Sequence, residues 1–161
     1  MAANQAPVVS NTTPLINLVG VGLLDLLPGL YGAVTIADAV RDEYTVGKSK
    51  TDPDLNLLPW LQIVTSVTIH ASLPSALGAG EAATLSLALA VNARAVLLDE
   101  TYGRRVARKL GLPVVGTLGV LLAAKQDGLL PAVAPVIEQM IQQGRHISTQ
   151  LKAQVLRAAG E

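Results

Sequence analysis

Four side chains that carry oxygen donors lie in four separate parts of the sequence: Asn11, Glu43, Glu81 and Asp99. Clustered carboxylates repel one another unless a cation or a proton lies between them. Donor sets made only of oxygen suit Mg²⁺ or Mn²⁺ rather than zinc. Such ions activate water and stabilise the charge of a phosphodiester during cleavage. If these four side chains meet, they form a candidate metal site for hydrolysis of nucleic acid.

The ends of three apolar segments suggest where these four side chains would meet. Residues 7–10, 93–98 and 112–115 read as buried strands, and each is followed by polar side chains. Parallel strands place their carboxyl ends at one edge of a sheet, where ligands of α/β proteins bind. We therefore expect one edge to carry Asn11, Asp99, Glu100 and Thr117.

Two helical patterns bring further charges to this edge. Glu43 lies on a predicted helix over 37–44 that follows a strand over 33–36, and Glu81 opens a buried helix over 80–92. The helix predicted over 101–111 begins directly after Glu100 and carries the densest positive cluster of the chain, Arg104, Arg105, Arg108 and Lys109. Acids for a metal beside bases for phosphate are a reasonable layout for a nuclease.

The remaining segments predict an α/β fold. We expect one or two helices over 14–28, with Thr13 as N-cap and Pro14 at the first helical position. A loop over 45–56 and an edge strand over 61–69 follow, then helices over 116–128, 131–143 and 148–159. Alternating strands and helices with nearly continuous apolar strands indicate a parallel sheet covered on both faces.

Composition narrows the function classes. The 161 residues predict a single domain over 1–161, and 50% hydrophobic residues without phenylalanine predict an aliphatic core. Net charge is zero, so a general basic field for nucleic acid is absent. Without cysteine and with two histidines, disulfides, thiolate zinc sites and multi-histidine metal sites are excluded. The first residues lack the pattern of a signal peptide and no apolar run spans a bilayer, so we expect a cytoplasmic protein without a membrane segment.

Four stretches resemble the PIN-domain proteins, and in particular their VapC-like branch: VVSNTTPLINL (8–18), AVRDEY (39–44), GEAATLSLALA (80–90) and the block over 97–131. The resemblance extends over about 8–157. It implies a three-layer α/β/α sandwich with a central, mainly parallel sheet. It also implies cleavage of single-stranded or structured RNA with Mg²⁺ or Mn²⁺, a toxin silenced by an antitoxin protein, and a homodimer.

The resemblance also assigns residues. Glu43, Glu81 and Asp99 take the second, third and fourth acidic positions, and Asn11 takes the first, where most of the family has aspartate. Thr13 is the hydroxyl that follows the first motif. Arg104 and Thr117 belong to the pattern of the branch, and we expect them to contact substrate together with Glu100 and Arg105.

Asn11 divides the functional hypotheses. A unit charge about 4 Å from a cation is worth ~4 kcal/mol at an effective dielectric of 20, so an amide binds metal more weakly than aspartate. The leading hypothesis is a metal-dependent endoribonuclease. The alternative is a catalytically weakened PIN-fold module that binds nucleic acid or another partner. A receiver or phosphatase of another doubly wound type would need an acidic pair after the first strand, which SNTTP lacks.

Each site residue also has a purely structural interpretation. Asn11 could form an Asx turn, and Glu81 is favoured by the dipole of its helix. Glu43 could be a solvated acid, and Asp99 could cap the helix over 101–110. The arginines could form a solvated helix face, and Thr117 could act only as an N-cap. The joint placement of these side chains, rather than any one of them, favours the functional interpretation.

Overall fold

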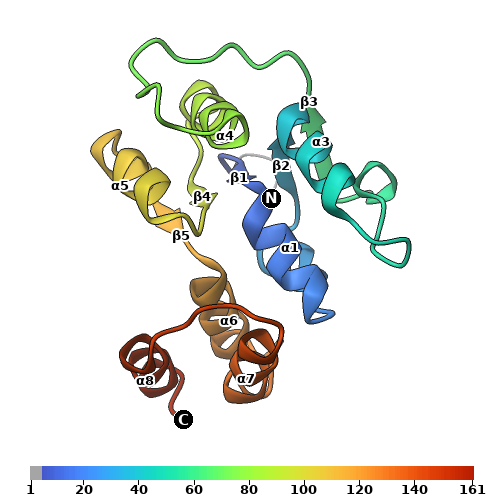
Figure 1. The fold of residues 1–161 in the computed structure, drawn as a ribbon, viewed down its shortest axis with the longest axis vertical. Helices are drawn as coiled ribbons and strands as arrows, with labels where there is room; N and C mark the ends of the chain where they lie inside the picture. The colour runs from blue at the N-terminus through green and yellow to red at the C-terminus, as the bar shows by residue number, and fades with distance from the viewer. Residues whose placement is uncertain (1–4) are drawn as a thin grey trace.

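A computed structural model describes residues 5–161 (Figure 1). In chain order its elements are β1 (Val8–Ser10), α1 (Thr12–Gly20), α2 (Leu26–Tyr31), β2 (Val34–Ala37), α3 (Asp38–Gly47), the 3₁₀ turn η2 (Leu55–Leu57), β3 (Leu61–Val64), α4 (Ala79–Ala90), β4 (Ala95–Leu97), α5 (Thr101–Lys109), β5 (Val114–Val115), α6 (Thr117–Gln126), α7 (Ala134–Gln142) and α8 (Thr149–Ala158).

The five strands form one sheet in the order β3-β2-β1-β4-β5. All pairings are parallel, with Val9 opposite both Thr35 and Val96, and Leu97 opposite Val115. Helices lie between successive strands, as parallel connections require. The sheet therefore presents all its carboxyl ends at one edge, and the predicted parallel sheet is confirmed.

Alternating side chains of the central strands fill two aliphatic cores. Val8 and Leu97 belong to the core shared with α1, α2, α6 and α7, whereas Val9, Val96 and Leu98 belong to the core shared with α4 and α5. Helices thus cover both faces of the sheet, which gives the predicted three-layer α/β/α architecture (Figure 1). Within residues 5–161, no helix combines the length and apolarity needed to cross a membrane.

Two predicted N-caps are wrong by one or two residues. Asn11, rather than Thr13, is the N-cap of α1, and Pro14 lies in the first turn instead of at its first position. The helix begins early because the strand ends at Ser10 and the Asn11 N–H still bonds to the carbonyl of Leu97 (2.9 Å). Gly116, rather than Thr117, is the N-cap of α6.

The edge strand β3 is shorter than the β-branched segment 61–69 suggests. Pairing with β2 stops at Val64, and Ser66 adopts a positive φ of 56°. The Ser66 N–H donates to the Asp38 carboxylate at the start of α3 (3.1 Å). This turn directs the chain out of the sheet toward α4, so tertiary contacts override the local β propensity.

Candidate functional site

The candidate site lies at the carboxyl edge of the sheet. Asn11 directly follows β1, Asp99 follows β4 by two residues, and Thr117 begins the helix after β5. These side chains lie close to Asn17 of α1, to Thr84 of α4 and to the first turn of α6. The edge predicted from the sequence therefore gathers the expected residues.

Glu43 joins three helices. Its Oε2 accepts a hydrogen bond from Thr12 Oγ1 (2.7 Å), and its Oε1 accepts one from the Gly80 backbone N–H in the first turn of α4 (3.0 Å). A Cβ atom at Gly80 would overlap this carboxylate. The acid is therefore held by α1 and α4 while it projects from α3.

Glu81 has a buried carboxylate oxygen that no donor within residues 5–161 satisfies, and two other carboxylates lie nearby. Its Oε2 is buried without a hydrogen-bond partner among the described residues. It lies where a Cβ atom at Gly103 would approach it to 2.5 Å. Burial raises the pKa of Glu81, the backbone N–H of Gly78 opposes this, and the charges of Glu100 and Glu43 raise the pKa further. A bound cation would relieve both the burial cost and this repulsion.

Asp99 is bound to the N-terminus of α6. Its Oδ1 accepts from the Thr117 backbone N–H (2.7 Å), and its Oδ2 accepts from Thr117 Oγ1 (2.6 Å) and Asn17 Nδ2 (3.1 Å). The carboxylate thus caps α6, not the helix over 101–110 that the structural interpretation assigned to it. A metal or substrate can use only the carboxylate lone pairs of Asp99 that these three hydrogen bonds leave free.

Asn17 is a site residue that the sequence analysis missed. It is 7% exposed, its Nδ2 donates to Asp99 Oδ2 and to Thr117 Oγ1 (3.3 Å), and its Oδ1 has no partner within residues 5–161. An amide between Leu15 and Leu18 on the buried stripe of α1 is the only signal in the sequence. That signal did not show that its partner lies 82 residues away.

Asn11 is 3% exposed and lies beside α4. Thr84 Oγ1 is 3.4 Å from its Oδ1, but this hydroxyl donates to the Gly80 carbonyl at 2.7 Å. The side chain makes no capping bond to α1. Its amide oxygen is therefore available beside α4 as a neutral donor for a ligand.

The predicted substrate residues differ in how firmly their side chains are held near these acids. Thr13 Oγ1 lies 3.5 Å from a Glu100 carboxylate oxygen, and Arg104 Nη1 donates to the Leu98 carbonyl (3.0 Å). Burial lowers the pKa of Arg104, Arg108 lowers it further, and Asp99 offsets part of this effect. Arg105 is exposed and makes no hydrogen bond or salt bridge within the described part of the chain.

The donor set suits a hard divalent cation, although the carboxylates are not drawn together around one point. No group of three acidic or histidine side chains within residues 5–161 has the spacing of a preformed metal site. Carboxylate and amide oxygens are nonetheless the ligands of Mg²⁺ and Mn²⁺, and the orphaned Glu81 oxygen lies near Glu43 and Glu100. The residues present therefore fit such an ion in the chemistry of their donor atoms.

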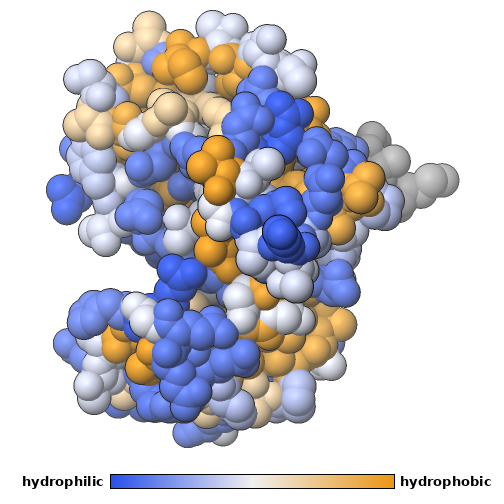
Figure 2. Space-filling view, turned by 45° about the vertical axis from the view of Figure 1, so that its right-hand side comes forward, coloured by the Kyte–Doolittle hydropathy of each residue, from blue (hydrophilic) through white to orange (hydrophobic). Residues whose placement is uncertain are grey.

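Two hollows adjoin Asp99, and both are also lined by Leu118 and Leu151. A groove of about 670 Å³ runs between α5 and α8 and is lined by Arg104, Arg108 and apolar side chains. The surface in Figure 2 is notched between the part formed by the sheet layers and the part formed by α6–α8. A second pocket of about 450 Å³ lies between α1, α6 and the connection from α7 to α8. Polymer on either side of the site would find room in these hollows.

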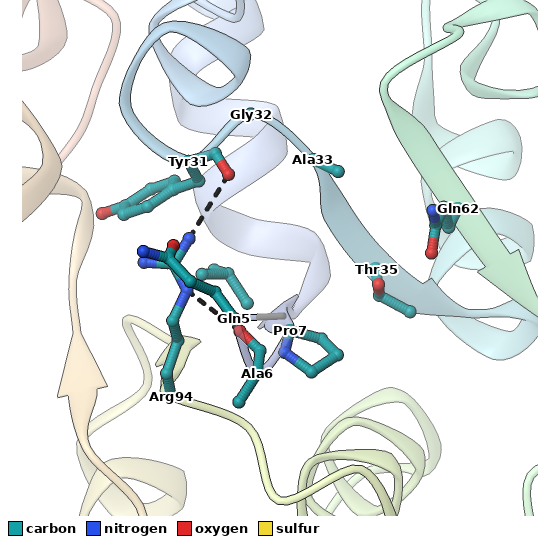
Figure 3. A pocket seen from close by; sticks show the side chains of 10 residues that line it. Gln5, Ala6, Pro7, Tyr31, Gly32, Ala33, Thr35, Gln62 and Arg94 are labelled. Carbon is teal, nitrogen blue, oxygen red and sulfur yellow. Dashed lines mark hydrogen bonds between the residues drawn. The ribbon is translucent and has the colours of Figure 1, made fainter. Parts of the chain in front are cut away.

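A further pocket lies at the amino ends of the strands, away from the acids (Figure 3). Arg94 dominates it, but its guanidinium already donates to the carbonyls of Ala6 (2.9 Å) and Tyr31 (3.3 Å) and stacks 5.8 Å from the Tyr31 ring centre. These contacts fasten the start of β1 to the end of α2. This pocket therefore has a structural explanation.

Comparisons with known proteins give one match. A family model described as a PIN domain matches residues 7–161, which is nearly the whole chain. No curated protein and no solved structure matches the sequence.

Proposed function

Because the chain belongs to the PIN-domain family, whose members are generally nucleases, we propose that it is a Mg²⁺- or Mn²⁺-dependent endoribonuclease. Cleavage would take place at the carboxyl edge of the sheet. The observation that carries the proposal is the Glu81 oxygen that is buried without a partner and repelled by two neighbouring carboxylates. A buried acceptor of this kind is costly for the fold unless a ligand satisfies it.

In this proposal Glu43, Glu81, Asp99 and Asn11 hold the cation. When bound, the cation supplies a more acidic water and neutralises charge on the phosphate. Thr12 and Gly80 fix the orientation of Glu43, and Asn17 and Thr117 fix that of Asp99. These hydrogen bonds prepare the donors before substrate arrives, which lowers the cost of assembling the site.

The substrate is held by the groups around this centre. Arg104 and its neighbour Arg105 attract the phosphates, although Arg104 spends one N–H on the Leu98 carbonyl. Thr13, Glu100 and Thr117 contribute hydrogen bonds near the reacting group. The positive side chains lie next to the acids, so the RNA backbone can pass between them.

Glu81→Gln tests the proposal with little risk to the fold, because no hydrogen bond to Oε2 is lost. We expect wild-type protein to cleave a single-stranded RNA with Mn²⁺ and not with EDTA. The variant should lose about 100-fold in cleavage rate, the scale for removing one group that stabilises transition-state charge. It should also bind Mn²⁺ more weakly in calorimetry.

Asp25→Asn is the matched control, because Asp25 is an exposed carboxylate with no side-chain cap bond in α2. It should cleave as wild type does. A Glu81→Gln protein that cleaves at the wild-type rate would remove the proposed mechanism.

Asn11 favours a second candidate, a PIN-fold module with weakened catalysis that binds nucleic acid. Asn11→Asp separates the two, because aspartate keeps the shape of the side chain while it adds a charge. If wild type is attenuated, the substitution should raise Mn²⁺ affinity and cleavage by tenfold or more, since each 1.4 kcal/mol is a factor of ten. Substantial wild-type cleavage that this substitution leaves unchanged would rule out the weakened module.

Assembly and cellular role extend the same proposal. We propose a homodimer, because aliphatic side chains such as Val46 and Leu57 are 89% and 78% exposed. We also propose a toxin role with an antitoxin partner. Growth arrest on expression that Glu81→Gln abolishes would support the toxin role, and sedimentation would test the dimer.

A further inference from the structure

The pocket between α1, α6 and the α7–α8 connection brings a distant part of the chain to the acids. One wall carries Asn17, Asp99 and Glu100, and the other carries Arg145 and His146. The sequence analysis assigned no role to either of these two residues. The volume of about 450 Å³ lies within the roughly 300–1,000 Å³ of pockets that take small ligands.

The basic wall is held in place by backbone and side-chain bonds. Gln143 Nε2 donates to the Gly20 carbonyl at the end of α1 (2.7 Å), and the Arg145 N–H donates to the Met140 carbonyl (3.0 Å). Gly144 supplies the positive φ of 91° that the turn requires. On the far side Ser148 caps α8 through the Leu151 N–H (3.1 Å). The connection is therefore a built turn, not a loose segment.

The Arg145 side chain is uncommitted. It is exposed and forms no salt bridge or side-chain hydrogen bond among residues 5–161. The residue lines the pocket that also holds Asp99 and Glu100, and it lines a neighbouring pocket with Lys48 and Asp52 as well. A free guanidinium in such a pocket can take a phosphate group whose neighbour lies at the acids.

The rest of the pocket suits a nucleobase. Leu118, Met140, Ile147 and Leu151 supply an apolar wall, and Leu151 is 42% exposed. Asn17 lies at the inner end, nine-tenths buried, with a carbonyl oxygen that lacks a donor. An apolar wall with one unsatisfied amide and a cation among the lining residues suits a flat heterocycle that carries a phosphate.

We propose that this pocket binds one unpaired nucleotide of the RNA next to the cleaved phosphate. Its base lies against the apolar wall, and Arg145, assisted by His146, binds its phosphate. The inference rests on the proposed function for the identity of the polymer. It places a substrate subsite on the α7–α8 connection, in a pocket that the α5 arginines do not line.

Binding without cleavage tests this subsite. A fluorescein-labelled single-stranded RNA of eight nucleotides is titrated by anisotropy in EDTA at several salt concentrations. Arg145→Ala should weaken binding about tenfold and lower the salt slope by about 0.7, the value for one lost phosphate contact on a single strand. Arg157→Ala is the control, because it removes the same charge from the exposed end of α8, outside the pocket.

The apolar wall is tested by Leu151→Glu against Ala153→Glu, which adds the same charge to another exposed position of α8. Leu151→Glu should weaken binding clearly more than its control, with unchanged circular dichroism melting for both. Equal effects of Arg145→Ala and Arg157→Ala, or of the two glutamate variants, would overturn the subsite. Because the assay needs neither metal nor turnover, RNA binding that depends on Arg145 would stand even if wild type cleaves nothing.

Discussion

At Asp99 a single carboxylate serves two parts of the molecule. Three hydrogen bonds tie it to Thr117 and Asn17, so it fixes the start of α6 as well as offering oxygens to a ligand. Hydrogen bonds to charged groups are stronger than those between neutral groups. The residues that hold Asp99 therefore matter for stability as well as for the proposed chemistry.

Thr117→Val isolates one of these bonds while it keeps the shape of the side chain. Thr117 is 2% exposed, and its hydroxyl donates to Asp99 and accepts from Asn17. We expect the free energy of unfolding to fall by about 1–3 kcal/mol, as measured by urea denaturation at pH 7. Thr101→Val in the exposed first turn of α5 should change it by less than ~0.5 kcal/mol. Equal losses would show that the Asp99 bond contributes nothing specific.

Single-residue prediction from the sequence succeeded where a residue follows a strand. Asn11, Asp99 and Thr117 lie at the predicted edge because a parallel sheet forces strand ends together. Asn17 and Arg145 were missed because their roles depend on contacts across the chain that no local pattern reveals. The roles of the predicted residues in metal or RNA binding stay predictions.

Among the elements, the contact between α3 and α4 depends on the absence of a side chain. Gly80 donates its N–H to Glu43, and a Cβ there would displace that carboxylate. Replacing a helical glycine by alanine usually stabilises a protein by about 0.5–1 kcal/mol. At position 80 the sign should reverse.

Gly80→Ala should therefore lower the free energy of unfolding by about 1 kcal/mol, because the Glu43 bond is lost. It should also abolish the rise in melting temperature with Mn²⁺ that the proposed metal site predicts for the wild type. Gly47→Ala is the control, since a Cβ at the end of α3 meets nothing within 4 Å. Thermal melts with and without Mn²⁺ measure both effects, and a stabilised Gly80→Ala protein would contradict the expectation.

Element types were largely predictable, whereas their ends were not. Apolar strands and the helices between them followed from hydrophobic periodicity and turn residues. The ends of β3 and the first residue of α1 were set by Ser66 and by the Asn11 bond to β4. Such long-range bonds override local propensity, so sequence alone places boundaries poorly.

At the scale of the whole molecule, Glu161 fastens the end of the sequence to the helices α6 and α7. Its carboxylate accepts hydrogen bonds from the N–H groups of Val133 (2.7 Å) and Ala134 (3.0 Å) and pairs with Lys125 (2.9 Å). The Val133 bond, the Lys125 bond and the Ala134 bond lower the pKa of Glu161 to about 2. These bonds join the end of α8 to α6 and to the start of α7, the helix that precedes Arg145.

A pKa lowered on folding stabilises the charged form, so this contribution is present above about pH 4.5 and is lost as pH falls toward 2. Glu161→Gln should therefore unfold at lower urea than wild type at pH 7, and the difference should shrink through this acid range. Glu138→Gln, which removes the exposed ion pair of α7 with Lys152 of α8, should show a smaller difference. A Glu161 difference that is constant from pH 7 to pH 2 would contradict the assignment.

The layered architecture and the edge that carries the acids followed from the sequence, and the family model agrees with the resemblance to PIN-domain proteins. The approach of the α7–α8 connection to that edge did not follow from it. Helices after the last strand have no register that fixes their position, so their docking is decided by packing against α6 and α1.

Glu43 and Asp99 have a structural role besides their proposed role in catalysis, which affects how conservation of these acids among relatives is interpreted. Both acids hold helices together, so a descendant that had abandoned nucleic-acid cleavage would still keep them for the sake of its architecture. Within residues 5–161, the Oε2 atom of Glu81 makes no hydrogen bond that would hold the fold together. Whether homologues keep or replace Glu81 is therefore a better sign of selection for enzyme activity than whether they keep Glu43 and Asp99.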